Sequence, residues 1–156
     1  DVCQSRGVKG LGVIGMCLTG NFAISLIADD YVLAAVASQP AMPFFNQGAL
    51  HMSAEDVAEV RTELDDKGAM QLLRFEDDPL CTSEKSECIH KAFNNEGAMR
   101  VEEITLPGKG HSVLTLDFVD EEGHPTRAAL ERVLAYFKRQ LTSADGRKGL
   151  CKETEL

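Results

Sequence analysis

The sequence GLGVIGMCLTG, residues 10–20, decides the fold of this chain. Its apolar run stops at Cys17, and a turn of small residues leads into a second apolar stretch over residues 21–28. This pattern predicts a buried strand over 10–16, a sharp turn carrying Cys17, and a helix over 18–28. A side chain on such a strand-to-helix turn stands above the sheet with a helix N-terminus beneath it. Because that terminus carries partial positive charge and favours a thiolate, Cys17 is the predicted nucleophile.

The same stretch also satisfies the dinucleotide-binding pattern G-x-G-x-x-G, through Gly10, Gly12 and Gly15. That site needs a strand before the first glycine and a helix that opens within the motif. Here a short polar segment precedes Gly10, and the helical pattern begins only after Cys17. We therefore expect these glycines to lie inside a strand, and we expect no nucleotide or other cofactor.

Composition limits the class of protein. The 156 residues, 44% of them hydrophobic, are enough for one domain with a core. A net charge of −9 argues against nucleic acid or an anionic membrane as partner. No apolar run is long enough to span a bilayer, and no signal-peptide pattern precedes residue 10, so we expect a soluble protein.

Cysteine usage favours a reducing, cytoplasmic location. The cysteines are odd in number and irregularly spaced, and they form no Cys-x-x-Cys pair, so the sequence predicts neither a disulfide framework nor a metal site. Apart from the predicted nucleophile, we expect them to be inert apolar side chains. They are Cys3, Cys17, Cys81, Cys88 and Cys151.

The rest of the chain alternates strands and helices, which predicts a parallel sheet with helices on both faces. After the first pair we expect strands at 31–37, 69–75 and 99–106, the last nearer an edge because its middle is charged. We expect helices from Ser53 to Gly68, from Thr82 or Ser83 to Asn95, and from Pro125 to Leu141, followed by a polar tail over 142–156.

Ligands of parallel sheets bind at the carboxyl ends of the strands. Cys17 follows the first predicted strand, Asp77 and Asp78 follow the third, and His111 follows the fourth. The sequence therefore brings a thiol, a carboxylate and an imidazole to one edge, with Asp78 favoured over Asp77 as the carboxylate. The N–H of Leu18 is the predicted oxyanion donor.

Four stretches resemble the C-terminal half of a dienelactone hydrolase family protein. The resemblance implies an α/β-hydrolase fold, of which this chain has a sheet of about four strands. The stretches are GVIGMCLTGNFA at 12–23, AAVASQPAMPF at 34–44, LRFEDDPLCTSE at 73–84 and LPGKGHSVLT at 106–115. The resemblance implies that Cys17 is the nucleophile, Asp78 the acid and His111 the base. It also implies hydrolysis of small esters or lactones through a thioester, and a partial domain over 1–141 without the N-terminal half of the fold.

The sequence departs from that family at three positions. Thr19 replaces a glycine two residues after the nucleophile, and Thr82 stands where a proline often follows the acid. Thr115 occupies the position of the arginine that holds a carboxylate in dienelactone hydrolases proper. The absent half is also expected to supply the second oxyanion amide.

Other features have plainer interpretations. We expect His51, His90 and His124 to be solvated, while Phe44 and Phe45 either line a pocket or fill the core. As an alternative function, the chain is a non-catalytic fragment or assembly module. In that case the apolar edge of its first strand pairs with another chain or with a second copy.

Overall fold

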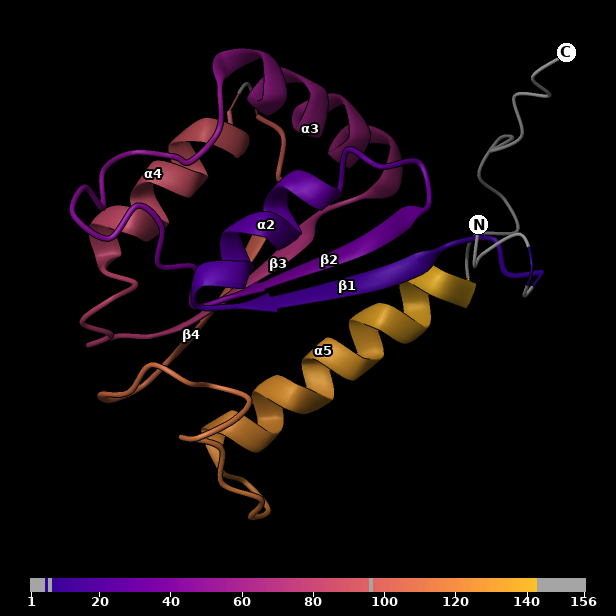
Figure 1. The fold of residues 1–156 in the computed structure, drawn as a ribbon. Coiled ribbons are helices and arrows are strands. Elements are labelled where there is room, and N and C mark those ends of the chain that lie inside the picture. The colour runs from indigo at the N-terminus through magenta and orange to yellow at the C-terminus, as the bar shows by residue number, and fades with distance from the viewer. Residues whose placement is uncertain (1–4, 6, 96, 143–156) are drawn as a thin grey trace, which may run out of the picture.

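The computed structural model describes residues 5, 7–95 and 97–142, in which strands and helices alternate (Figure 1). The elements are β1 (Leu11–Met16), α2 (Leu18–Leu26), β2 (Val32–Ser38), α3 (Ala54–Lys67), β3 (Met70–Phe75), α4 (Ser83–Phe93), β4 (Val101–Leu106) and α5 (Pro125–Thr142). The predicted order of elements is confirmed. Thr142 belongs to α5, and the rest of the predicted polar tail lies outside the described residues.

The strands form one four-stranded parallel sheet in the order β1-β2-β3-β4. Every residue of β2 and β3 is buried, as expected for parallel strands covered on both faces. β4 lies at one edge, as its charged middle predicts, and β1 forms the other edge.

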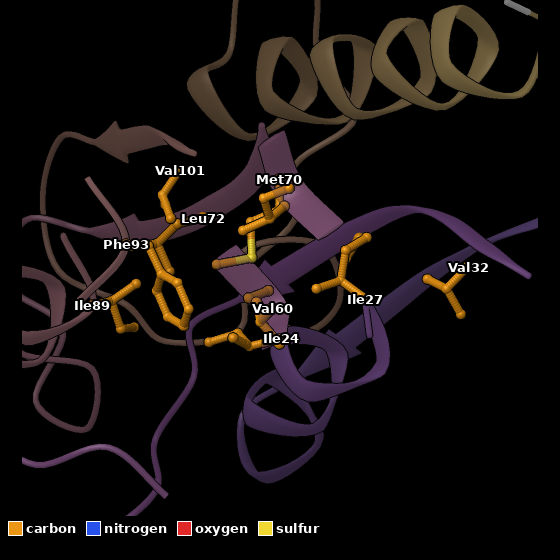
Figure 2. Close-up of a cluster of buried hydrophobic side chains, with 12 residues drawn as sticks. Ile24, Ile27, Val32, Val60, Met70, Leu72, Ile89, Phe93 and Val101 are labelled. Carbon is orange, nitrogen blue, oxygen red and sulfur yellow. The ribbon is translucent and has the colours of Figure 1, made fainter. Parts of the chain in front are cut away.

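Helices cover both faces of this sheet, as predicted. In Figure 1, α2, α3 and α4 lie over one face and α5 crosses the other. Two separate apolar clusters fill the space between sheet and helices. The first, drawn in Figure 2, joins the sheet to three helices through Ile24, Ile27, Val60, Leu64, Ile89 and Phe93. The second places Ala129, Val133 and Tyr136 of α5 against the sheet.

The predicted helix starts coincide with observed caps. The Ser53 hydroxyl accepts from the Asp56 N–H, and the Asp56 carboxylate accepts from the Ser53 N–H, which completes a capping box. Thr82, rather than Ser83, caps α4 by accepting the Lys85 N–H. A proline at position 82 would have no side-chain oxygen for this bond.

Two helices end earlier than predicted. α2 stops at Leu26 instead of Ala28. The buried ammonium of Lys67 donates hydrogen bonds to the carbonyls of Ile27 and Asp29, which follow the helix. α4 stops at Phe93, because the side-chain oxygen of Asn94 accepts the N–H groups that lead into β4. None of the helices in the described part of the chain is long and apolar enough to cross a membrane.

Candidate active site

Cys17 lies on the turn between β1 and α2, at the N-cap position of the helix. Its φ of 52° and ψ of −117° fall in a region that non-glycine residues rarely occupy, at a conformational cost of about 1–3 kcal/mol. Three hydrogen bonds hold this backbone: the Cys17 N–H donates to Ser38, and the Cys17 carbonyl accepts from Gly20 and Ala41. The strained turn leaves the thiol half-buried at the carboxyl end of the strand.

The glycines before Cys17 serve close packing. A Cβ at Gly15 would lie 2.0 Å from the Thr19 carbonyl oxygen, and one at Gly12 would lie 2.5 Å from the Phe137 ring. Gly10 lies one residue before the strand begins, whereas Gly12 and Gly15 lie within β1, as the sequence predicts. They therefore let a helix approach the strand, and they do not form the phosphate-binding turn of a dinucleotide site.

Thr19, where the family has glycine, takes part in the turn. Its hydroxyl donates to the Met16 carbonyl at 2.8 Å and accepts the Met16 N–H at 2.9 Å. The threonine thus fastens the first turn of α2 to the end of β1, directly beside Cys17.

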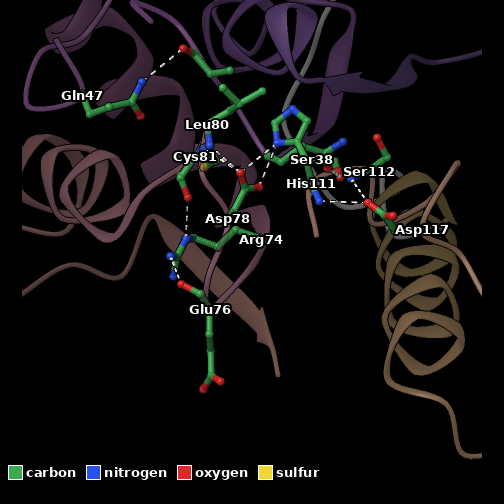
Figure 3. A network of polar contacts seen from close by, with 12 residues as sticks. Ser38, Gln47, Arg74, Glu76, Asp78, Leu80, Cys81, His111, Ser112 and Asp117 are labelled. Carbon is green, nitrogen blue, oxygen red and sulfur yellow. Dashed lines mark hydrogen bonds and ion pairs between the residues drawn. The ribbon is translucent and has the colours of Figure 1, made fainter. Parts of the chain in front are cut away.

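Asp78 lies in the turn that follows β3, with its side chain fully buried. Its Oδ1 accepts the N–H groups of Leu80 and Cys81, each at 2.8 Å. Both carboxylate oxygens lie 2.9 Å from Nδ1 of His111 (Figure 3). The neighbouring Asp77 is exposed, so the carboxylate that contacts the imidazole belongs to Asp78.

His111 lies in the loop after β4, with its imidazole mostly buried. Because an ionised carboxylate only accepts hydrogen bonds, Nδ1 carries the proton toward Asp78 in the neutral ring. Nε2 is then an acceptor, and it is buried without a hydrogen-bond partner among the residues that the structure describes. The contact with Asp78 therefore leaves Nε2 as the acceptor atom of the ring.

The three predicted residues thus all follow strands at the same edge of the sheet, and the structure joins two of them directly. Cys17 follows β1, Asp78 follows β3 and His111 follows β4. Within the described residues, no hydrogen bond links the Cys17 sulfur to the His111 imidazole. Leu18 is the first residue of α2, where an N–H group has no partner inside the helix.

Two residues that the sequence did not single out hold the loops of this site. The buried Arg74 of β3 donates from Nε to the Cys81 carbonyl at 3.0 Å and from a terminal nitrogen to the Glu76 carbonyl at 2.8 Å, on either side of Asp78. Asp117 contacts the backbone of the His111 loop. Neither has a sequence signal, since an arginine in a strand and an aspartate in a loop are common.

The other histidines are hydrogen-bonded and only partly exposed, which corrects the expectation that they are solvated. His51 contacts Asn21 and Ser25, His90 contacts Glu103 and Asn94, and His124 contacts Thr126. These contacts tie loops and helices together, which explains why polar rings occur at these positions.

Phe44 and Phe45 do not fill the core. Phe45 is fully exposed and Phe44 is 43% exposed. Of the two roles considered for them, a core role is therefore excluded.

A cavity of about 400 Å³ lies beside the His111 loop, but its lining does not include the three predicted catalytic residues. It is bordered by Phe75, Gly108, Lys109, Leu116, Asp117 and His124, among others. Among the residues that the structure describes, no cluster of histidine, cysteine and carboxylate side chains could hold a metal ion.

The chain has a parallel sheet with a cysteine on its first strand-to-helix turn, and an acid and a histidine follow in chain order at the same edge. This arrangement defines the α/β-hydrolase class of fold. The chain belongs to the dienelactone hydrolase family, whose family model matches residues 1–141. Comparison with curated proteins found no match.

Solved structures share the fold. The esterase Pf2001 of Pyrococcus furiosus, solved in two crystal forms, is 16% identical to this chain, with TM-scores of 0.58 and 0.53. The matches cover 85% of this chain but only 54% and 55% of the esterase. The chain therefore spans about half the length of these structural neighbours.

Proposed function

We propose that the protein containing this chain hydrolyses small esters or lactones through Cys17, His111 and Asp78. Membership of the dienelactone hydrolase family supports a hydrolase. The observation that carries the finer assignment is the His111 imidazole, which has Asp78 on Nδ1 and a buried Nε2 with no hydrogen-bond partner in the described part of the chain. A ring held in this way is oriented to accept a proton.

In the proposed reaction, Nε2 of His111 accepts the Cys17 thiol proton, and the sulfur forms a bond to the substrate carbonyl carbon. The carbonyl oxygen becomes an oxyanion that accepts the Leu18 N–H. When the carbon–oxygen bond to the leaving alcohol breaks, His111 returns its proton to that oxygen. Asp78 stabilises the imidazolium between these steps.

The resulting thioester is hydrolysed in the second half of the cycle. His111 takes a proton from water, whose oxygen attacks the thioester carbon, and the carbon–sulfur bond breaks as the thiol recovers its proton. The Cys17 to His111 contact must form for this chemistry, and contacts of this kind often tighten only when substrate binds.

The residue at position 115 bears on the substrate class, and the thiols bear on the location. Thr115 is exposed where dienelactone hydrolases proper carry an arginine, so this position offers no cation for a substrate carboxylate. A neutral ester or lactone therefore suits the site better than a dienelactone acid. The free thiols of Cys17, Cys81 and Cys88 suit the cytoplasm.

The test is ester hydrolysis by the full-length protein and its variants. Loss of one oxyanion donor costs about a hundredfold to a thousandfold in rate in other enzymes, so the assay needs the whole protein and both donors. Cys17→Ala should abolish hydrolysis of an activated ester, and Asp78→Asn should lower kcat/KM by roughly 10³-fold or more. Cys88→Ala is the matched control. A Cys17→Ala variant with full activity would exclude the proposal.

A second candidate function is assembly through β1. This edge strand exposes Leu11 by 38% and Ile14 by 41%, and Phe22 and Leu26 of α2 are about half-exposed beside it. An apolar edge strand of this kind pairs readily with another strand. Under this proposal the chain self-associates, and Ile14→Lys reduces the association measured by sedimentation velocity. A monomer at all concentrations would contradict it.

A further inference from the structure

Asp117 holds the backbone on which His111 is mounted. Its Oδ2 accepts the N–H of His111 at 2.9 Å and the N–H of Ser112 at 2.8 Å (Figure 3). The Asp117 N–H in turn donates to the Ser112 carbonyl at 3.1 Å, so Asp117 and the His111 loop are joined through both backbone and side chain. A single side chain therefore binds two consecutive amides at the predicted catalytic histidine.

These are charge-assisted hydrogen bonds. The N–H groups of His111 and Ser112 lower the pKa of Asp117 below its usual value, so the carboxylate is ionised at neutral pH. Hydrogen bonds from backbone amides to a carboxylate are shorter and stronger than those to a neutral acceptor. The observed distances of 2.9 and 2.8 Å lie at or below the commonest N–H···O distance of about 2.9–3.0 Å.

The loop needs such an attachment because its own sequence is permissive. The segment that leads to His111 contains Gly108, with a φ of +88°, and Gly110. Glycines leave a backbone many accessible conformations. The Asp77 N–H also donates to the Gly108 carbonyl and so helps to fix this segment.

We propose that Asp117 is a positioning residue, which fixes the backbone of His111 so that the imidazole stays against Asp78. Asp78 holds the ring and Asp117 holds the main chain, and the two attachments together limit its movement. Displacement of a catalytic group by about 1 Å can cost on the order of a hundredfold in rate. This proposal rests on the proposed hydrolase function.

Asp117 can be substituted without disturbing the core. Its side chain is exposed and borders the cavity of about 400 Å³ next to Lys109 and His124. Asp120, three residues further along the same exposed loop, pairs with Arg127 instead and is the matched control.

The experiment compares Asp117→Ala, Asp117→Asn and Asp120→Ala in the full-length protein. Alanine at 117 should lower kcat about tenfold with little change in KM, because the substrate still binds and the base is misplaced. Asparagine keeps an acceptor oxygen and should restore kcat to within about threefold of the parent. Asp120→Ala should match the parent.

A second measurement does not depend on activity. Hydrogen exchange at the amides of His111 and Ser112 should be at least about tenfold faster in Asp117→Ala than in Asp120→Ala, since these amides lose their acceptor. Parent-like kcat in Asp117→Ala would overturn the proposal, as would unchanged amide exchange. Equal impairment in the alanine and asparagine variants would also overturn it, because an acceptor oxygen at position 117 would then not be what positions His111.

The Cys17→Ala variant separates the two failures. If Cys17→Ala still hydrolyses the ester, the hydrolase assignment fails, whatever Asp117 does. If Cys17→Ala is inactive and Asp117→Ala is normal, only the positioning role fails.

Discussion

The backbone of Gly15 approaches the carbonyl of Thr19 so closely that a Cβ on the glycine would lie 2.0 Å from the Thr19 oxygen. This contact joins the end of β1 to the first turn of α2 and sets the angle of the turn that carries Cys17. Since the obstructing atom belongs to the backbone, it cannot move aside as a side chain could. The elbow therefore depends on the absence of a side chain at position 15.

Gly15→Ala should destabilise the protein by about 2 kcal/mol or more and displace the thiol, because strand and helix must separate. Gly48→Ala is the control, since a Cβ there meets only the end of the Glu84 side chain. Urea unfolding of both variants measures the difference. Equal free energies of unfolding in the two variants would contradict this account of the turn.

Arg74→Ala should loosen the turn that carries Asp78. It removes the donors to the carbonyl of the buried Cys81 and to the partly buried carbonyl of Glu76, at a cost of about 2–4 kcal/mol. Urea unfolding and ester hydrolysis should both be impaired. The control Arg132→Ala removes only an exposed pair with Glu102 and should cost less than about 1 kcal/mol. Similar losses in the two variants would show that Arg74 has no special role.

Glu103 should make the fold sensitive to acid. Burial raises the pKa of Glu103, but hydrogen bonds from His90, Ser86 and Thr105 outweigh burial and lower it from 4.5 to about 2. A carboxyl with a lowered folded-state pKa stabilises the fold fully above its unfolded pKa and loses that contribution as pH falls. The free energy of unfolding should therefore drop between pH 4.5 and about 2, by on the order of 2 kcal/mol after allowance for screening.

Glu103→Gln tests this assignment. The variant should be less stable than the parent at neutral pH, and its free energy of unfolding should fall less across the same acid range. Chemical unfolding at several pH values gives both quantities. A variant whose stability falls as steeply as the parent's would assign the acid sensitivity to other carboxyls.

His51 should give a second pH dependence near neutrality. The Asn21 side-chain amide donates to the Met42 carbonyl and accepts the Met42 N–H, which identifies its nitrogen and its oxygen. The atom that contacts Nδ1 of His51 is the amide nitrogen, so Nδ1 is the acceptor. Nε2 of His51 therefore carries the proton and donates to the Ser25 hydroxyl. Protonation of Nδ1 would place two donors face to face. Burial, together with Lys85, lowers the pKa of His51 below 6.5, although a backbone hydrogen bond with Asn21 and the charge of Asp56 act in the opposite direction.

A histidine with a lowered folded-state pKa stabilises the fold while it is neutral. Below pH 6.5 the unfolded chain binds a proton that the folded chain does not, so the stability should fall as the pH falls. His51→Gln should remove this component. If the parent and His51→Gln lose the same stability between about pH 7 and pH 5, the predicted dependence is wrong.

Local signals made much of the fold predictable. Ser53 and Asp56 cap each other within one turn, and Pro125 begins α5, so both helix starts can be read from neighbouring residues. The buried strands β2 and β3 can also be predicted from the sequence, because apolar residues make up most of each. Cys17 could be singled out because the glycines and apolar residues around it describe the turn itself.

Contacts between distant segments could not be predicted in the same way. His51 meets Asn21 and Ser25 across a long separation in sequence, and nothing in the histidine's neighbourhood indicates those partners. Arg74 and Asp117 act on loop carbonyls and amides, whose directions depend on the folded loop. The sequence could therefore nominate side chains for chemistry but not the residues that hold them in place.

The most direct test of the central claim is to locate the acyl group after brief reaction of the full-length protein with an activated ester. Burial, with Asp78 nearby, raises the pKa of Cys81 to about 12, so this cysteine stays a thiol, and the half-buried Cys88 serves as an internal comparison. Peptide mass mapping should find the thioester on Cys17, and the adduct should be absent from Cys17→Ala. An acyl group found equally on Cys17 and Cys88, or on neither, would contradict the assignment of Cys17 as the nucleophile.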